Sequence, residues 1–245
     1  MDVEKEVRFF DQFEAEHGDY DVLTEGAYDR LLGVIEKQIR PQPGWHCVDL
    51  GCGTGAFTRR LARFQLELTG IDISPRSIER ANAQGGGRFL VGDISQCTLP
   101  TASCDLVVMS GVLHHIPKKA IRVQCLREAR RILRPGAYFF SYDPNASSPS
   151  MFLFRDPRSP LYSSVGKTEN EVLLTDCEIH DDLEDSGFSD IGIRGLSGIT
   201  YRFVEGRLPM LVLPLYNAIY EPLIRFSPFE NLLGTFLTAV ARKAS

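Results

Sequence analysis

The residues of this chain best suited to bind a ligand are a carboxylate and the three glycines that follow it at alternate positions: Asp49, Gly51, Gly53 and Gly55. The apolar residues before Asp49 predict a buried strand, and the residues from Ala56 onward predict a helix. Glycine reaches positive φ at no steric cost and has no Cβ to keep a ligand away from the backbone. The backbone N–H groups at the start of a helix point into the same space. The stretch therefore predicts a strand, a tight loop and a helix that together seat a cofactor.

Two classes of cofactor fit this loop. The spacing Gly51-x-Gly53-x-x-Ala56, with Asp72 about twenty residues further on, satisfies the loose dinucleotide-binding fingerprint. Asp49 favours a different ligand, because a carboxylate at the strand end suits a cation such as an amino acid's ammonium better than a pyrophosphate. Gly55 also departs from the dinucleotide pattern, since it makes the spacing G-x-G-x-G.

The eight residues from Val48 to Gly55, VDLGCGTG, resemble the first motif of the class I S-adenosylmethionine-dependent methyltransferases. The resemblance implies an α/β fold with a doubly wound, mostly parallel seven-stranded sheet, N-terminal helices and a helical cap inserted near the C-terminus. It also implies S-adenosylmethionine as the cofactor and S-adenosylhomocysteine as the product. The residues of this motif that it assigns to cofactor binding are Asp49, Gly51, Cys52, Gly53 and Gly55.

Further acidic residues follow the next two predicted strands. The second strand ends in Asp72 and Ile73, and a short third strand is followed by Asp93 and Ile94. In open parallel sheets, ligands bind at the carboxyl ends of the strands. A carboxylate at Asp72 can there accept hydrogen bonds from both ribose hydroxyls, the alternative being an acid that only interacts with a helix dipole. The family resemblance implies that Asp93 accepts a hydrogen bond from the adenine amino group and that Ile94 packs on the base.

The fourth predicted strand runs into Ser110 and Gly111 and then into a loop with His114 and His115. The backbone at Gly111 can approach a ligand closely. The stretch resembles the fourth-strand motif of the same family. When a hydroxyl group accepts a methyl group, a base has to take its proton, and histidine titrates in the right range. His114 and His115 are therefore the candidate catalytic bases, the alternative being that one of them only caps or packs the turn.

The elements that position these residues follow from the spacing of apolar residues and from proline and glycine. Helices are expected over residues 3–14, 24–40, from 56, from 75, over 118–133 with its arginines outside, and over 173–187. Strands are expected from residue 45, over 66–73, 88–91, 104–109 and 138–142, near 191–193 and over 235–241. Residues 133–136 are expected to form the turn that ends a helix. Four βα units in a row predict a parallel, doubly wound sheet. By the resemblance, the last strand is antiparallel at the sheet edge.

We expect one methyltransferase domain over residues 1–245. Its predicted parts are an N-terminal helical lid (1–44), a cofactor-binding core (45–142), substrate-side insertions and a cap (143–234) and a closing strand (235–245). The resemblance is specific for residues 45–142 and general elsewhere. Phe10, Tyr20 and Tyr142 are the candidates for closing over an acceptor or orienting it.

Two segments of the C-terminal half lie outside the regular pattern. Residues 143–169 are rich in proline, serine and aromatic residues and predict a long ordered loop. Residues 203–228 are apolar but interrupted by prolines, so they predict the short helices of a cap rather than a membrane span. Weak contact of 203–228 with a membrane surface is the alternative. A roofed pocket of this kind suits a bulky small molecule.

The net charge and the cysteine spacing limit which classes of partner and ligand are expected. The 245 residues carry a net charge of −5, with 43% hydrophobic and 24% charged residues, which is typical of a globular protein. The basic surface of a nucleic-acid binder is missing, so no nucleic-acid partner is expected. The six cysteines form no C-x-x-C pair and no zinc pattern, so no metal site is expected. The N-terminus lacks the pattern of a secretory signal, which predicts a cytoplasmic protein of undetermined oligomeric state.

The sequence therefore predicts transfer of a methyl group from S-adenosylmethionine to an oxygen, nitrogen or carbon of a bulky small molecule, such as a natural product, a quinone, or a sugar- or lipid-linked intermediate. One alternative is a noncatalytic module that binds S-adenosylmethionine. The other is an NAD(P)-dependent oxidoreductase, which Asp49, Gly55 and the lack of a Tyr-x-x-x-Lys set disfavour.

Overall fold

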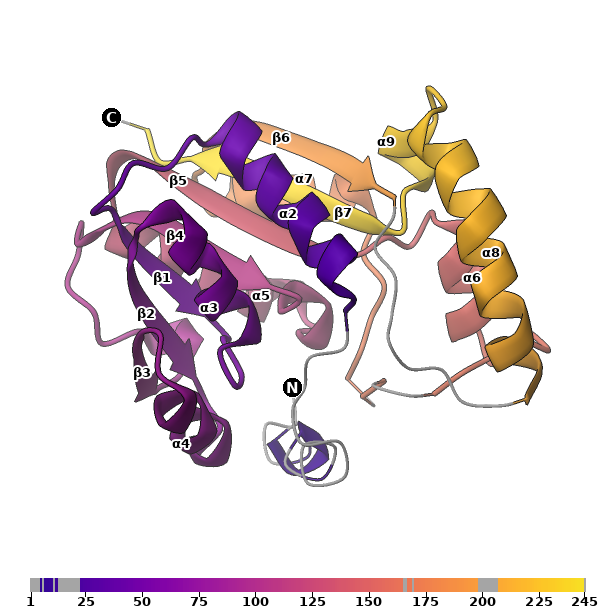
Figure 1. The fold of residues 1–245 in the computed structure, drawn as a ribbon. Coiled ribbons are helices and arrows are strands. Elements are labelled where there is room, and N and C mark those ends of the chain that lie inside the picture. The colour runs from indigo at the N-terminus through magenta and orange to yellow at the C-terminus, as the bar shows by residue number, and fades with distance from the viewer. Residues whose placement is uncertain are drawn as a thin grey trace.

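The computed structural model describes residues 5, 7–10, 12, 23–164, 167–168, 170–197 and 207–244. Its strands are β1 (His46–Leu50), β2 (Glu67–Asp72), β3 (Arg88–Val91), β4 (Cys104–Ser110), β5 (Leu133–Pro144), β6 (Ser189–Leu196) and β7 (Phe236–Arg242). They form a seven-stranded sheet in the order β3-β2-β1-β4-β5-β7-β6 (Figure 1). β1 to β5 pair in parallel, whereas β7 pairs antiparallel with both β5 and β6. The doubly wound, mostly parallel sheet predicted from the sequence is confirmed.

Helices connect these strands. They are α2 (Glu25–Gln38), α3 (Ala56–Arg60), α4 (Pro75–Gln84), α5 (Lys119–Ile132), α6 (Pro149–Arg155), α7 (Asp176–Asp185), α8 (Arg207–Arg225) and α9 (Glu230–Leu233), with short 3-10 helices η1 (Leu61–Phe64), η2 (Ile94–Gln96) and η3 (Leu113–His115). The described residues of the helix expected over 3–14 are helical as well. α4 begins where the sequence indicates, because the Ser74 hydroxyl accepts a hydrogen bond from the Ser77 N–H and Pro75 fills the first helical position.

Two apolar cores lie on opposite faces of the sheet, because successive side chains of a strand point to opposite faces. One core contains Phe139 of β5 together with residues of α5 and α7, such as Leu126 and Leu183. The other contains Phe140 of β5 together with residues of α2, α3 and η1, such as Leu31. The central strands are thus covered on both sides, which leaves their carboxyl ends as the edge open to a ligand.

Two details of the sheet differ from the prediction. β7 is antiparallel as expected, but it lies between β5 and β6, and β6 forms the edge. The second detail concerns residues 133–136, which begin β5 instead of forming a separate turn. Leu133 pairs with Cys104, the next pair is Tyr138 with Leu106, and the extra residues bulge out between them. A proline and a glycine are common where a strand bulges, so the same signal fits both structures.

The C-terminal half contains more regular structure than the sequence suggested. α6 lies within the segment 143–169 that was expected to be a loop. Residues 207–225 form one continuous helix, α8, although the sequence predicted several short ones. Pro209 lies in its first turn, where the missing N–H has no intrahelical partner to lose. Pro214 and Pro222 each remove one hydrogen bond from the helix, and the remaining bonds hold it together.

α5 carries one arginine on its inner side, against the expectation that all its arginines lie outside. Arg122 is buried, and its Nε lies 2.5 Å from Oδ2 of Asp182 on α7. Its Nη1 also donates to the carbonyl of Ile116, just after η3. Arg122 thus contacts both Asp182 and the Ile116 carbonyl, whereas Oδ1 of Asp182 has no hydrogen-bond partner among the described residues. Arg122 ties α5, α7 and the histidine-bearing loop into one unit.

Candidate functional site

A cavity of about 460 Å³ opens at the carboxyl ends of β1, β2 and β4. This is a normal size for a pocket that binds a cofactor or a drug-sized molecule. Thirteen of the sixteen residues singled out from the sequence line it: Phe10, Gly51, Cys52, Gly53, Asp72, Ile73, Asp93, Ile94, Ser110, Gly111, His114, His115 and Tyr142. Asp49 and Gly55 are not among its lining residues, and Tyr20 lies outside the described residues.

The glycine loop between β1 and α3 needs glycine for two different reasons. Gly51, Gly53 and Gly55 all have positive φ, at 79°, 52° and 79°. A Cβ on Gly51 would lie 2.6 Å from Cγ2 of Val112, and one on Gly55 would lie 2.7 Å from the ring of Phe89. By contrast, no heavy atom of the described residues lies within 4 Å of a Cβ built on Gly53, which lines the cavity. Gly51 and Gly55 allow tight packing, and Gly53 leaves open space for a ligand.

Replacing Gly53 by alanine should therefore weaken cofactor binding without unfolding the protein. The new methyl group would occupy cavity space, and overpacking of this kind costs about 1–3 kcal/mol, or about 5- to 150-fold in affinity. Gly44 is the matched control, since it also has a positive φ and an open Cβ position but does not line the cavity. Thermal melting should show that both variants lose a similar, small part of their free energy of unfolding, about 1–2 kcal/mol. Equal cofactor affinity in Gly53→Ala and Gly44→Ala would contradict the assignment.

Asp72, at the end of β2, joins the glycine loop to α4. Its Oδ2 accepts a hydrogen bond from the Gly53 N–H at 2.8 Å, and its Oδ1 accepts one from the Ser74 N–H at 2.9 Å. Burial raises the pKa of this carboxyl, and the hydrogen bonds from Ser74 and Gly53 act in the opposite direction. Each carboxylate oxygen has further lone pairs, and the residue lines the cavity. Asp72 is thus held in place by the backbone, while its remaining lone pairs can accept hydrogen bonds from the two hydroxyl groups of a diol.

Asp49 lies behind the cavity wall rather than in it. Its carboxylate is completely buried and accepts hydrogen bonds from the hydroxyls of Thr58 at 2.6 Å and of Ser110 at 3.4 Å. Burial raises its pKa from 3.8 to about 7, and the two hydroxyls lower it. Asp49 therefore connects α3 to the end of β4. Its predicted contact with an ammonium group stays a prediction.

The raised pKa of Asp49 has a consequence for stability. Between pH 3.8 and about 7 the folded protein binds more protons at this site than the unfolded chain, so the carboxyl makes folding less favourable as the pH rises. An asparagine there could still accept from Thr58 and could donate to Ser110. Without ligand, Asp49→Asn should thus be more stable than the wild type by about 1–3 kcal/mol at pH 8, with little difference at pH 4. Urea unfolding at both pH values measures this, and equal stability at pH 8 would contradict the buried carboxylate.

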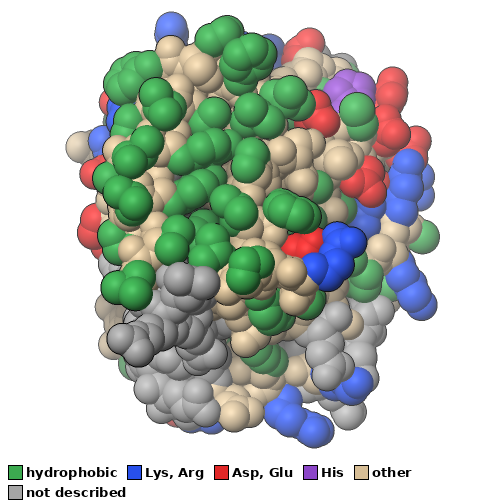
Figure 2. Space-filling model, turned by 90° about the vertical axis from the view of Figure 1, so that its right-hand side faces the viewer, with side chains coloured by type: hydrophobic (Ala, Val, Ile, Leu, Met, Phe, Trp, Pro, Cys, Tyr) green, Lys and Arg blue, Asp and Glu red, His purple; other side chains and the backbone are tan. Residues whose placement is uncertain are grey.

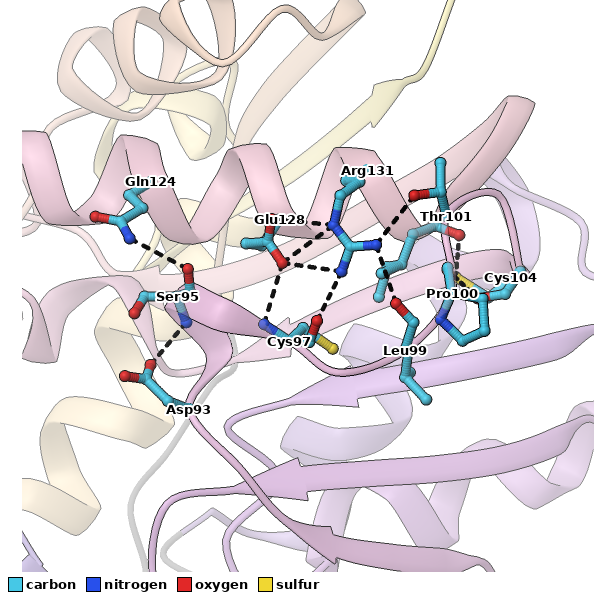
Figure 3. Close-up of polar contacts among 12 residues, drawn as sticks. Asp93, Ser95, Cys97, Leu99, Pro100, Thr101, Cys104, Gln124, Glu128 and Arg131 are labelled. Carbon is cyan, nitrogen blue, oxygen red and sulfur yellow. Dashed lines mark hydrogen bonds and ion pairs between the residues drawn. The ribbon is translucent and has the colours of Figure 1, made fainter.

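The segment after β3 is held by α5, as Figure 3 shows. Oδ1 of Asp93 accepts from the Ser95 N–H at 2.8 Å, and Gln124 of α5 donates to the Ser95 carbonyl. Further along, Glu128 accepts from the Cys97 N–H while Arg131 donates to the Cys97 carbonyl. These contacts fix the backbone that carries Asp93 and Ile94, so both residues face the cavity from a rigid turn.

The two histidines of η3 have different partners. Nδ1 of His114 lies 2.8 Å from Oδ1 of Asp143, and the His114 backbone N–H donates to the same oxygen. Nδ1 of His115 lies 3.2 Å from the Thr168 hydroxyl, and its ring meets Phe10 edge to face. When Asp143 is ionised, Nδ1–H of His114 donates to it, so proton transfer to a ligand falls to Nε2. His114 thus has the arrangement of a carboxylate-oriented base.

Asp143, near the end of β5, is the functional candidate that the sequence reasoning missed. It is fully buried, and its Oδ2 has no hydrogen-bond partner among the described residues. Burial raises its pKa to about 7, against the effect of the His114 N–H. It stands near the carboxyl end of a parallel strand, as Asp72 does, and this position was the signal that could have revealed it.

The remaining cavity wall comes from segments on which the sequence is less informative. Leu23, Tyr28, Arg155, Glu171 and Phe236 line the cavity as well, from before α2 to β7. Arg155 ends α6 and is buried, and its Nη1 donates to the Ser163 carbonyl. Tyr142 packs edge to face against Phe57, at 5.3 Å between ring centroids. This part of the wall is mostly apolar and aromatic, which suits an organic molecule with a large apolar surface.

Comparison with known proteins agrees with this geometry. Residues 48–141 match a family model described as a methyltransferase domain. An O-methyltransferase of Penicillium expansum, cnsE, is 27% identical over 67% of this chain and 59% of its own length. The 27-O-demethylrifamycin SV methyltransferase of Amycolatopsis mediterranei is 34% identical over 49% of this chain and 47% of its own length. The chain thus spans about half of the length of these curated relatives.

Solved structures support the fold. A SAM-dependent methyltransferase from Thermotoga maritima superimposes with a TM-score of 0.62, over 97% of this chain and 95% of its own, at 18% sequence identity. At that identity the likeness concerns the arrangement of the helices and strands. It extends beyond the residues that the family model matches and includes the C-terminal strands.

Proposed function

Since residues 48–141 form a methyltransferase domain of the class I S-adenosylmethionine-dependent family, we propose that the whole protein transfers a methyl group from S-adenosylmethionine to a bulky small-molecule acceptor. The observation that supports this most directly is one cavity that joins the glycine loop and Asp72 to the His114–Asp143 pair. Relatives whose names state O-methylation favour an oxygen atom of the acceptor, with nitrogen and carbon as the alternatives.

The residues present fit S-adenosylmethionine. The open space at Gly53 takes the part of the cofactor nearest the backbone, and Asp72 accepts the ribose hydroxyls. Asp93 and Ile94 hold the adenine from the turn after β3. The cofactor supplies a methyl group already activated by a positively charged sulfur, so the protein's tasks are to align the acceptor and to exclude water.

His114 removes the proton when the acceptor is a hydroxyl group. Asp143 holds the imidazole through Nδ1, which leaves Nε2 to take the proton. His115 and Phe10 pack beside it and close the cavity on the side of the N-terminal helix. Phe10 and Tyr142 then contact the acceptor. The apolar wall formed by Leu23, Tyr28, Tyr142 and Phe236 supports a bulky organic acceptor.

We also propose that the protein works in a reducing compartment, the cytoplasm. All six cysteines are free, and five of them are buried. Burial raises the pKa of the Cys52 thiol in the glycine loop, so this residue packs as a small apolar side chain and is not a nucleophile. No nucleic acid is expected as a partner, since the chain is acidic overall.

The activity is tested by incubating the protein with S-adenosylmethionine carrying a deuterated methyl group and a panel of phenols, hydroquinones, polyketides and lipid alcohols. Mass spectrometry should find S-adenosylhomocysteine together with an acceptor heavier by one deuterated methyl group. Cofactor binding with no methylated product over the whole panel would favour a noncatalytic binding module. NAD(P) binding with no affinity for S-adenosylmethionine would instead favour the oxidoreductase.

A further inference from the structure

The outer face of α8 exposes a continuous row of apolar side chains. Leu211, Leu215, Ile219 and Leu223 recur every four residues, so they lie on one face of the helix, and each is more than 50% exposed. Phe226 continues the row at 83% exposed, and its N–H still bonds to the Pro222 carbonyl. Figure 2 shows this side of the molecule, where hydrophobic side chains fill the centre and charged ones lie mostly towards its edges.

The other face of α8 is apolar too. Tyr216 stacks on Tyr220 and meets Phe154 of α6 edge to face at 5.3 Å, and Ile224 is buried. A surface helix normally turns a polar face to water, and a helix that is apolar all round is normally covered on all sides. The exposed row is larger than the scattered apolar residues of an ordinary surface. The outer face of α8 is therefore a contact surface.

The charged residues of α8 indicate what covers its outer face. α8 begins and ends with an arginine, and the 17 residues between them contain one charged residue, Glu221. Arginines at the ends of an apolar helix suit the phosphate groups of the headgroup layer in which a surface-bound helix lies. Pro214 and Pro222 leave two helix carbonyls without their usual intrahelical donors, which favours a depth where water and headgroups are present. Among the described helices none has the length and apolarity needed to cross a bilayer.

A short path connects this surface to the cavity. α6 lies beside α8 in Figure 1 and packs on it through Phe154 and Tyr216. Phe152 of α6 is 61% exposed, whereas Arg155, one turn further, lines the cavity. A helix of seven residues therefore reaches from the apolar surface to the wall of the proposed acceptor pocket.

We propose that the outer face of α8, together with Phe152 and Phe226, docks on the surface of a lipid bilayer, and that the acceptor is a lipophilic molecule taken from that bilayer. The docking rests on the exposed apolar row and on the arginines at the ends of α8, and it does not depend on the proposed function. The statement about the acceptor rests on the proposed methyltransferase function. Since the chain carries a net charge of −5, attraction to anionic lipids contributes little, and the apolar side chains supply the binding.

Flotation of the full chain with vesicles tests the docking. The wild type should float with vesicles of pure phosphatidylcholine, gain less than about threefold from added phosphatidylglycerol, and keep its binding at high salt. The double variant Leu215→Ser/Ile219→Ser should lose at least about tenfold in vesicle affinity, because two large apolar side chains no longer leave water. Val91→Ser is the control, since Val91 is also an exposed apolar residue, at 55%, but lies on β3, the edge strand opposite to β6.

Other outcomes contradict the docking. If the wild type stays at the bottom of the gradient while light scattering shows a dimer that Leu215→Ser/Ile219→Ser converts to monomers, the face is an interface with a second copy. Binding only to anionic vesicles, abolished by salt, would assign the contact to charge. Titration with S-adenosylmethionine separates this inference from the proposed function, because the double variant should bind the cofactor as the wild type does. Wild type that floats but binds no cofactor would refute the function and leave the docking intact.

Discussion

Replacing Asp72 by alanine is expected to weaken S-adenosylmethionine binding by about 100-fold or more. Hydrogen bonds to a charged group contribute about 1.5–3 kcal/mol each, and the variant loses two from the ribose diol. It also releases the Gly53 and Ser74 N–H groups, so the glycine loop is less well held. Titration calorimetry at neutral pH measures the affinity, and thermal melting of the same sample without ligand reports how far the loop alone is affected.

Two further variants separate the ligand contact from the loop contact. Asp72→Asn keeps one oxygen to accept from a backbone N–H but loses the charge, so it should melt closer to the wild type and still bind weakly. Asp93→Ala removes a single contact at the adenine end and should cost about tenfold. If Asp72→Ala binds S-adenosylmethionine as the wild type does, the ribose does not lie at the end of β2.

Replacing His114 by alanine is expected to lower kcat by about 10²- to 10⁴-fold on a hydroxyl acceptor, with the affinity for S-adenosylmethionine nearly unchanged. In the proposed function Nε2 of His114 takes the proton, and Asp143 orients the ring through Nδ1. Asp143→Asn should therefore give a smaller loss and alter the pH profile of kcat, since the pKa of Asp143 lies at about 7 in the wild type. Initial rates of S-adenosylhomocysteine formation across pH 5 to 9 measure both effects.

His115 provides the matched comparison. It adjoins His114, with ring centroids 4.0 Å apart, and lines the same cavity, but its Nδ1 contacts the Thr168 hydroxyl instead of a carboxylate. His115→Ala should therefore raise KM for the acceptor more than it lowers kcat. A loss of kcat in His115→Ala that equals or exceeds the loss in His114→Ala would exchange the two roles. Full activity of His114→Ala would show that no base is needed at this position.

The doubly wound, mostly parallel sheet and the carboxyl edge as the side of the candidate cofactor site could be predicted because both depend on local patterns. Buried strands appear as apolar runs, and the residues just after them reach the same edge of a parallel sheet. Asp72, Asp93 and Ser110 follow this rule, and the family resemblance supplied the expected role of Asp93. Asp143 obeys the same rule near the end of β5, but it begins the segment rich in proline and serine, whose composition hides the end of the strand.

The features that could not be predicted depend on contacts between residues far apart in the chain or on elements too short to show a pattern. Asp49 accepts a hydrogen bond from Ser110, 61 residues away, and its carboxylate is completely buried. α6 has only seven residues, too few for a helical period, although Ser148 and Pro149 repeat the start signal of Ser74 and Pro75. α8 is continuous despite its two interior prolines, and its Tyr216 contacts Phe154 of α6, which is distant in the sequence.

We propose that the cavity at the ends of β1, β2 and β4 binds S-adenosylmethionine. Titration calorimetry of the purified protein with S-adenosylmethionine, S-adenosylhomocysteine and NAD tests it most directly. We expect one site per chain for each of the two sulfur ligands, loss of binding of both in Asp72→Ala, and no heat from NAD. Binding of NAD alone, or of none of the three, would contradict the methyltransferase function and leave the doubly wound fold as the part that stands.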